Sequence, residues 1–154
     1  MWSKELELDY RMILNPHVLY VLPKLKAKGY KLTIASSSSM ENIKKVTRQC
    51  GIASYFDCMV SGVDLKESKP DPAIYLDTLR RLNLKPEEVI AIEDSTYGIQ
   101  ACIGANIRVI AKEANRYDFN QDLADVIASD ILDAYNIIKY WNLEENYFFV
   151  TGIL

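Results

Sequence analysis

Two stretches of the 154-residue chain decide its fold, KLTIASSSS at residues 31–39 and VIAIEDSTYGIQACIGA at residues 89–105. Each begins with a run of apolar residues rich in β-branched side chains and passes directly into polar residues and a helical pattern. Continuous apolar runs of this kind are typical of strands that are buried on both faces of a sheet. The two stretches therefore predict parallel strands that are joined by helices.

Similar apolar runs recur along the chain and alternate with helical patterns. We expect strands at residues 31–35, 58–61, 89–93, 107–111 and 125–128. Capping side chains and first-turn prolines predict helix starts at Asn15-Pro16, Ser38 and Asp71-Pro72, and two more helices are expected at residues 97–104 and 131–141. The predicted fold class is α/β, a three-layer open parallel sheet with helices on both faces.

Composition limits the classes of function. The chain has 18 Lys and Arg against 21 Asp and Glu, and because no basic block stands out, a nucleic-acid partner is not expected. The apolar runs fall short of the roughly 18 residues that a membrane span needs, and the N-terminal residues have no signal-peptide pattern. Three cysteines without CxxC spacing indicate reduced thiols, so we expect a cytoplasmic protein.

Serines follow the first of the two decisive strands. In an open parallel sheet, ligands bind beyond the carboxyl ends of the strands. Ser36 and Ser37 can present hydroxyl groups there, beside the free N–H groups at the start of the next helix, which is one half of a phosphate site. A plain loop and helix cap is the alternative explanation for these serines.

A lysine stands in the loop beyond the second expected strand. Lys69 is followed by Pro70 and by a helix start, so its ammonium group can be held toward the edge of the sheet as a compact charge for a phosphate oxygen. The alternative is a solvated surface lysine.

Two adjacent carboxylates end the strand at residues 89–93. Glu93 and Asp94 would repel each other unless a positive charge stands nearby. Magnesium is suited to this place, because it binds to one or two carboxylates together with water and phosphate oxygens. The alternative is a capping role for Asp94 or Ser95 at the following helix.

In this order and spacing, the motifs resemble those of the haloacid dehalogenase superfamily, in particular the β-phosphoglucomutase-like branch of its phosphatases and mutases. IASSS resembles the second motif of the family, SKPDPAIY the third and VIAIEDSTYGIQACIGA the fourth. The resemblance implies a Rossmann-like core and magnesium-dependent phosphoryl transfer, through an aspartyl-phosphate, on a small phosphorylated metabolite. It further implies that Ser36 binds the phosphoryl group, that Lys69 acts as a catalytic residue which binds and neutralises the phosphoryl group and the nucleophile, and that Glu93 and Asp94 bind magnesium. Ser37 is a further candidate phosphate ligand from its place beside Ser36.

The first motif of the family, an apolar strand followed by DxDG with the nucleophilic aspartate, does not precede the serines. The 30 residues before KLTIA are typical of two helices. We therefore expect a core domain at residues 1–141 that lacks the nucleophile strand and the cap domain and is inactive alone, followed by an apolar tail at 142–154. Because the nucleophile strand is central in the family, its absence would expose unpaired strand edges.

The last seven residues, FFVTGIL, can be aligned with the family pattern FDLDGVL, in which Phe148, Gly152 and Leu154 match. In this hypothesis the tail supplies the central strand, with Phe149 at the nucleophile and Thr151 at the second aspartate. Phenylalanine cannot accept a phosphoryl group. A frayed tail, a dimer contact and translation past a frameshift are alternatives, and a complementing fragment or a homodimer partner is another source of the strand.

Two other functions fit part of the pattern. A non-catalytic remnant of the fold would keep the phosphate and magnesium site without turnover. A phospho-accepting receiver domain also uses carboxylates, a hydroxyl and a lysine at strand ends. Receivers, however, place the acidic pair before the hydroxyl and the lysine, whereas Ser36 comes first here. The order of the motifs therefore argues against a receiver.

Overall fold

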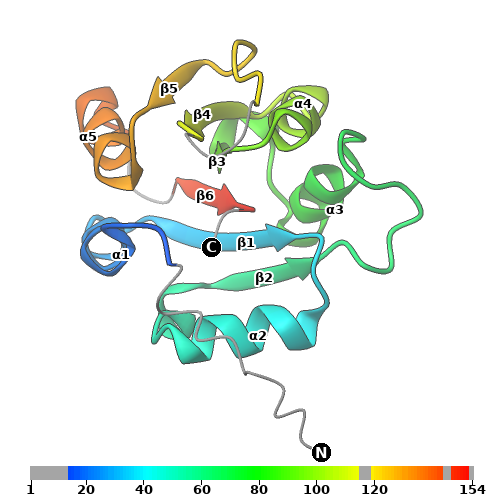
Figure 1. Cartoon of the computed structure of the whole chain (residues 1–154), viewed down its shortest axis with the longest axis horizontal. Coiled ribbons are helices and arrows are strands. Elements are labelled where there is room, and N and C mark those ends of the chain that lie inside the picture. The colour runs from blue at the N-terminus through cyan, green and yellow to red at the C-terminus, as the bar shows by residue number, and fades with distance from the viewer. Residues whose placement is uncertain (1–13, 115–118, 144–146, 153–154) are drawn as a thin grey trace, which may run out of the picture.

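One six-stranded parallel sheet forms the centre of the protein, as a computed structural model describes it for residues 14–114, 119–143 and 147–152. Its strand order is β2-β1-β6-β3-β4-β5 (Figure 1). The strands are β1 (Lys31–Ser36), β2 (Cys58–Ser61), β3 (Val89–Glu93), β4 (Arg108–Lys112), β5 (Val126–Ala128) and β6 (Phe148–Thr151).

Helices cover both faces of the sheet. The core cluster on one face contains residues of the first two helices and the last, and the cluster on the other face contains residues of the two between them. These helices are α1 (Val18–Ala27), α2 (Met40–Gln49) and α5 (Ile131–Trp141) on the first face, and α3 (Ala73–Leu82) and α4 (Thr96–Gly104) on the second. Short 3-10 turns are η2 (Ala53–Tyr55) and η3 (Pro86–Glu88). The predicted three-layer α/β fold is confirmed.

The five predicted strands are present, with bounds that differ by at most one residue. The largest displacement is at the fourth strand, which begins at Arg108 because the Ile107 N–H donates to the Cys102 carbonyl at the end of α4 (3.0 Å). Helix α5 spans Ile131–Trp141, as predicted. Apolar runs in this chain therefore mark the strands closely.

Two helix starts differ from the prediction. Helix α1 begins at Val18, two residues after Pro16, because His17 takes a left-handed conformation with φ of 70° and no side chain caps the helix. Helix α2 is capped by Ser39, whose hydroxyl accepts a hydrogen bond from Asn42 N (3.1 Å), and not by Ser38. Consecutive serines are equivalent in sequence, so only the backbone geometry selects the cap.

Strand β6 fills the centre of the sheet. It pairs in parallel with β1 on one side and with β3 on the other, and Thr151 is level with Ile34 and Ile92. Figure 1 shows β6 between the strands that end in the serines and in the acidic pair. The tail of the same chain thus supplies the central strand, and this strand needs no second chain as its source. That the chain associates with a homodimer partner or a complementing fragment stays a prediction.

The two core clusters differ in the size of their side chains. Phe149 of β6 packs against the ring of Tyr30 on the α1 and α5 face, with ring centroids 5.1 Å apart. The next residue, Val150, faces α3 and α4, where the sheet presents mainly small residues, among them Ala35, Val60, Ala91, Val109 and Ala111. No helix in the described ranges is long and apolar enough to cross a membrane.

Candidate active site

Four segments meet at the carboxyl ends of the central strands. A Cβ built on Gly152, directly after β6, would lie 2.6 Å from Glu93 Oε1, 2.8 Å from Lys69 Nζ and 3.2 Å from the Ala35 carbonyl oxygen. Glu93 is the last residue of β3, and Ala35 directly precedes Ser36 at the end of β1. The structure therefore brings Lys69, Glu93 and the start of the serine loop together around Gly152.

Lys69 and Glu93 form a largely buried ion pair. Lys69 Nζ lies 2.8 Å from Glu93 Oε1, and their side chains are only 15% and 3% exposed. The hydroxyl of Tyr75, on α3, also donates to Glu93 Oε1. A buried carboxylate needs such partners, because an isolated buried charge is strongly unfavourable. Burial, together with the negative charge of Glu93, raises the pKa of Tyr75 well above its ordinary value of 10, so the hydroxyl keeps its proton as a donor.

Gly98 in the first turn of α4 allows this helix to begin directly against Glu93. A Cβ at this position would collide with both carboxylate oxygens of Glu93. The helix is capped by Ser95, whose hydroxyl accepts from Gly98 N (2.9 Å). The glycine is therefore required by the close approach of the carboxylate.

The turn at residues 68–71 aims Lys69 back across the edge of the sheet, as predicted. Asp71 N donates to the Ser68 carbonyl (3.0 Å), and Asp71 Oδ1 accepts from Ala73 N (2.9 Å) at the start of α3. These two bonds join the loop to the helix that also carries Tyr75. The prediction that Asp71-Pro72 starts a helix is confirmed, since α3 begins at Ala73.

The serine loop is held by the end of β2. Ser36 Oγ accepts from Ser38 N (3.2 Å), and the Ser61 hydroxyl donates to the Ser38 carbonyl (2.6 Å). Ser37 is exposed and lines a cavity of about 230 Å³ together with Lys69. The other residues that line this cavity are Gly62, Val63, Leu65, Glu67, Ser68 and Ile74. Ser37 and Lys69 thus face one space that a small ligand can enter.

The Asp94 carboxylate makes no hydrogen bond or ion pair among the described residues. Its main-chain carbonyl accepts from Gln121 Nε2 (2.7 Å), and the same amide group donates to the Lys112 carbonyl (2.7 Å). Because Ser95 caps α4, a capping role does not explain Asp94. Within the described ranges, no three His, Cys, Asp or Glu side chains gather to hold a metal ion. The candidate ligands at the end of β3 therefore stay the two adjacent carboxylates, Glu93 and Asp94.

The structure corrects the alignment of the tail. Phe149 is level with Leu32 and Ile90, deep in the sheet, and only 3% exposed. The residue of this segment that faces Lys69 is Gly152. The placement of Phe149 at the nucleophile and Thr151 at the second aspartate is therefore wrong, because the packing of Phe149 in the core sets the register of the strand.

Sequence reasoning missed Tyr75 and Gln121 as parts of this site, and it matched Gly152 to the family pattern without placing it beside Lys69 and Glu93. Tyr75 lies 18 residues before Glu93, and Gln121 lies 27 residues after Asp94. No local pattern predicts contacts over such separations. Gly98 and Ser95, in contrast, stand within the fourth motif, where a helix start was expected.

The family model for haloacid dehalogenase-like hydrolases matches residues 2–112, well over half of the chain. The chain belongs to this family. Among its relatives, a phosphorylated carbohydrates phosphatase from Thermotoga maritima is 42% identical over 96 residues, which are 62% of this chain and 44% of the relative.

Solved structures of the family have the same core. CbbY from Rhodobacter sphaeroides, in complex with phosphate, aligns with a TM-score of 0.66 at 30% identity, over 75% of this chain and 53% of the CbbY chain. A β-phosphoglucomutase from Clostridium difficile aligns with a TM-score of 0.68 at 25% identity, over 84% of this chain and 60% of the other. The present haloacid dehalogenase-like chain spans about half the length of the curated relatives it matches.

Proposed function

We propose that this chain forms the phosphoryl-binding core of a haloacid dehalogenase-like phosphatase or phosphomutase whose ligand is a small phosphorylated metabolite. The observation that carries the proposal is the meeting of Lys69 Nζ with the ends of β1 and β3 around Gly152. A compact ammonium group beside serine hydroxyls and a helix start is suited to phosphate oxygens. The names of two relatives, a phosphorylated carbohydrates phosphatase and CbbY in complex with phosphate, support the same class of ligand.

Ser36, Ser37 and Lys69 are the proposed phosphate ligands. The cavity beside Ser37 and Lys69 gives the ester access to the ammonium group. A phosphate monoester dianion competes with Glu93 for Lys69, and it carries more negative charge than the carboxylate. We therefore propose that binding turns Lys69 from Glu93 toward the cavity.

Magnesium is the proposed cofactor, and the residues present suit it. Asp94 offers a carboxylate with no partner in the described ranges, and Glu93 becomes available when Lys69 turns to the phosphate. One or two carboxylates together with phosphate oxygens and water are what magnesium uses in proteins. When bound, the ion would neutralise charge on the phosphoryl group.

The described residues of the tail place no acceptor for a phosphoryl group beside Lys69, since the Thr151 hydroxyl donates to the Ile92 carbonyl (3.0 Å) and the Tyr147 hydroxyl to the Glu87 carbonyl (2.9 Å). Gly152, which has no side chain, faces Lys69 at the place where an acceptor is needed. Phosphoryl transfer by covalent catalysis requires a nucleophilic side chain, such as a carboxylate. We therefore propose that the chain alone binds a phosphate ester and magnesium but does not turn the ester over.

Calorimetric titration of the full chain with inorganic phosphate, in the presence of magnesium, tests the binding site. We expect Lys69→Ala to weaken binding at least about tenfold, because a charged hydrogen bond is lost. Lys66→Ala is the matched control, since Lys66 is an exposed lysine of the same loop, and it should leave the affinity unchanged. Absence of phosphate binding by the unmodified chain would overturn the proposal.

A hydrolysis assay with p-nitrophenyl phosphate and magnesium tests the absence of turnover. We expect no release of p-nitrophenol above the background. Turnover by the unmodified chain that is lost in Asp94→Asn would show that the chain is catalytic as it stands. That result would contradict the proposal that the chain lacks an acceptor. It would not contradict the proposed phosphate site.

Gly152→Asp tests the acceptor position directly. The new side chain must displace the flexible ends of Lys69 and Glu93, which would lie 2.8 and 2.6 Å from its Cβ. We expect slow release of p-nitrophenol by this variant and none by Gly152→Asn, because an amide is not a nucleophile for this step. Equal rates for the two variants would show that position 152 is not the acceptor position.

A further inference from the structure

Tyr75 contacts both members of the buried ion pair. Its hydroxyl donates to Glu93 Oε1, the same oxygen that accepts from Lys69 Nζ (2.8 Å). Lys69 Nζ in turn lies 3.5 Å from the Tyr75 oxygen and 5.2 Å from the centre of the Tyr75 ring. One phenol group therefore contacts a proposed phosphate ligand and a proposed magnesium ligand at the same time.

Tyr75 is fixed in the core, whereas Lys69 is less enclosed. Tyr75 is 0% exposed and belongs to the core cluster between the sheet and the helices α3 and α4. The Lys69 side chain is 15% exposed and lines the cavity beside Ser37. An ammonium group on a flexible four-carbon chain can turn toward that cavity, but the buried ring cannot follow it. The Tyr75 hydroxyl therefore stays at Glu93 when Lys69 turns away.

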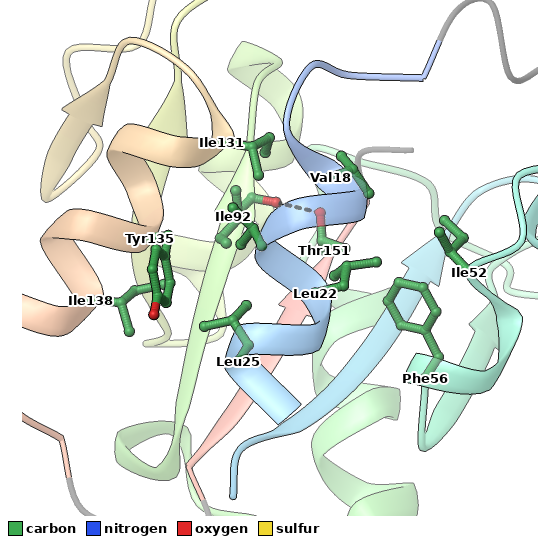
Figure 2. A pocket seen from close by; sticks show the side chains of 11 residues that line it. Val18, Leu22, Leu25, Ile52, Phe56, Ile92, Ile131, Tyr135, Ile138 and Thr151 are labelled. Carbon is green, nitrogen blue, oxygen red and sulfur yellow. Dashed lines mark hydrogen bonds between the residues drawn. The ribbon is translucent and has the colours of Figure 1, made fainter. Parts of the chain in front are cut away.

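The Glu93 carboxylate depends on these two donors. Within the described ranges, its side-chain donors are Lys69 and Tyr75. The nearby Thr151 hydroxyl donates instead to the Ile92 carbonyl (3.0 Å), as Figure 2 shows. A buried carboxylate that loses its only partner is strongly unfavourable. As the donor that remains, Tyr75 lowers the free-energy cost of separating Lys69 from Glu93.

We propose that Tyr75 is a positioning residue that holds the Glu93 carboxylate in place when Lys69 turns to a phosphate, so that phosphate binds without magnesium already present. This inference rests on the proposed function, because it takes Lys69 as a phosphate ligand and Glu93 as a magnesium ligand. Without the Tyr75 hydroxyl, Glu93 would depend on a bound magnesium ion for its partner. Binding of phosphate and binding of magnesium would then be coupled more strongly.

Calorimetric titration of the full chain with inorganic phosphate, at a limiting and at a saturating magnesium concentration, tests this role. Tyr75→Phe keeps the ring and removes only the hydroxyl. We expect it to weaken phosphate binding at least about tenfold at limiting magnesium, because a hydrogen bond to a charged group is lost. At saturating magnesium the loss should be less than about threefold, since Glu93 then has the ion as its partner.

Tyr30→Phe is the matched control variant. Tyr30 is also buried, on the opposite face of the sheet, and its hydroxyl donates to the Leu143 carbonyl (3.4 Å). This variant should leave both phosphate affinities unchanged. A loss in Tyr75→Phe that is equal at the two magnesium concentrations would show a merely structural role and would overturn the inference.

NMR of the unmodified chain, with tyrosine isotope-labelled at Cζ, decides the question if Tyr75→Phe does not fold. On saturation with phosphate at limiting magnesium, the Tyr75 signal should shift because Lys69 has left, while the Tyr30 signal stays unchanged. The Tyr75 hydroxyl proton should remain protected from exchange with solvent, because it still donates to Glu93.

The outcomes separate this inference from the proposed function. An unmoved Tyr75 signal, or loss of the protection of its hydroxyl proton, in the chain saturated with phosphate would overturn the inference and leave the phosphate site in place. Absence of phosphate binding by the unmodified chain at both magnesium concentrations would overturn the proposed function and the inference together.

Discussion

The two faces of the sheet are packed with side chains of different size. On the α3 and α4 face, small side chains such as Ala91 let the helices lie close, and this face supports the polar network of Tyr75, Glu93 and Lys69. On the α1 and α5 face, large side chains such as Phe149 form the core, and a cavity is left beside them. The face that supports the polar network is therefore closely packed, and the α1 and α5 face is packed more loosely.

Removal of residues 147–154 would break both faces together and has the largest expected effect. Strand β6 contributes Phe149 to one cluster and Val150 to the other, and its loss would leave β1 and β3 unpaired at the centre. We expect loss of cooperative thermal unfolding, measured by circular dichroism, and aggregation on size-exclusion chromatography.

The matched control for the deletion is Tyr147→Phe, which removes only the hydrogen bond from the Tyr147 hydroxyl to the Glu87 carbonyl. Its melting temperature should stay near that of the unmodified chain. An unchanged melting temperature and solubility after the deletion would contradict the central role of β6.

Enlarged side chains on the two faces should have opposite outcomes. Ala91→Leu forces extra atoms into the close contact with α3 and α4 and should lower the free energy of unfolding by about 1–3 kcal/mol or more. Val21→Leu extends into the cavity and should be neutral or stabilising by up to about 1 kcal/mol. Urea unfolding measures both, and equal losses would show that the two faces are packed alike.

Glycines on the two faces should also respond differently. Gly98→Ala places a methyl group against the Glu93 carboxylate and should destabilise the chain by about 1–3 kcal/mol while displacing the ion pair. Gly51→Ala meets no atom within 4 Å and should cost only the strain of its φ of 69°, about 1 kcal/mol. Only the first variant should also change phosphate binding, so an unchanged phosphate affinity in Gly98→Ala would count against the role of Glu93.

The smallest expected effect is a pH dependence on the α1 side. Burial raises the pKa of Asp57, but hydrogen bonds from Lys26 Nζ (2.6 Å) and Leu32 N (2.9 Å) outweigh it, so the pKa is lowered overall. A lowered folded-state pKa means that this stability is present above the unfolded value of about 4 and is lost as the pH falls through the folded value.

Asp57→Asn should therefore reduce the loss of stability as the pH falls into the acid range. The dependence of stability on pH near neutral should stay unchanged. Thermal unfolding between pH 7 and pH 3 measures this. Identical acid profiles for the variant and the unmodified chain would show that Asp57 does not contribute.

Much of the fold could be predicted from sequence because its signals are local. Buried parallel strands are apolar over their whole length, so VIAIE at residues 89–93 marks β3 without any knowledge of its neighbours. Strand β6 has a weaker signal, since FFVT could equally be a frayed tail. Its place in the sheet depends on β1 and β3, and its register depends on Phe149 and Tyr30, which are far apart in the chain.

The candidate site was predictable only in part. Ser36, Lys69 and Glu93 follow strands or stand in a marked loop, so strand-end reasoning indicates them. The pairing of Lys69 with Glu93 was not foreseen, because it depends on Tyr75 and Gly98 approaching the same carboxylate from two helices. Gly152 matches the family pattern, but because it has no side chain nothing in the sequence indicates that it faces Lys69 and Glu93.

The position of β6 has a consequence for the order of biosynthesis. Translation makes β1 and β2 first and β3, β4 and β5 next, yet these two groups touch in the sheet only through the strand that is made after both. Until β6 has been translated, a partial sheet of either group would therefore expose the strand edge, of β1 or of β3, with which β6 pairs in the folded chain. Such nascent intermediates are the stage at which exposed edges recruit chaperones or aggregate.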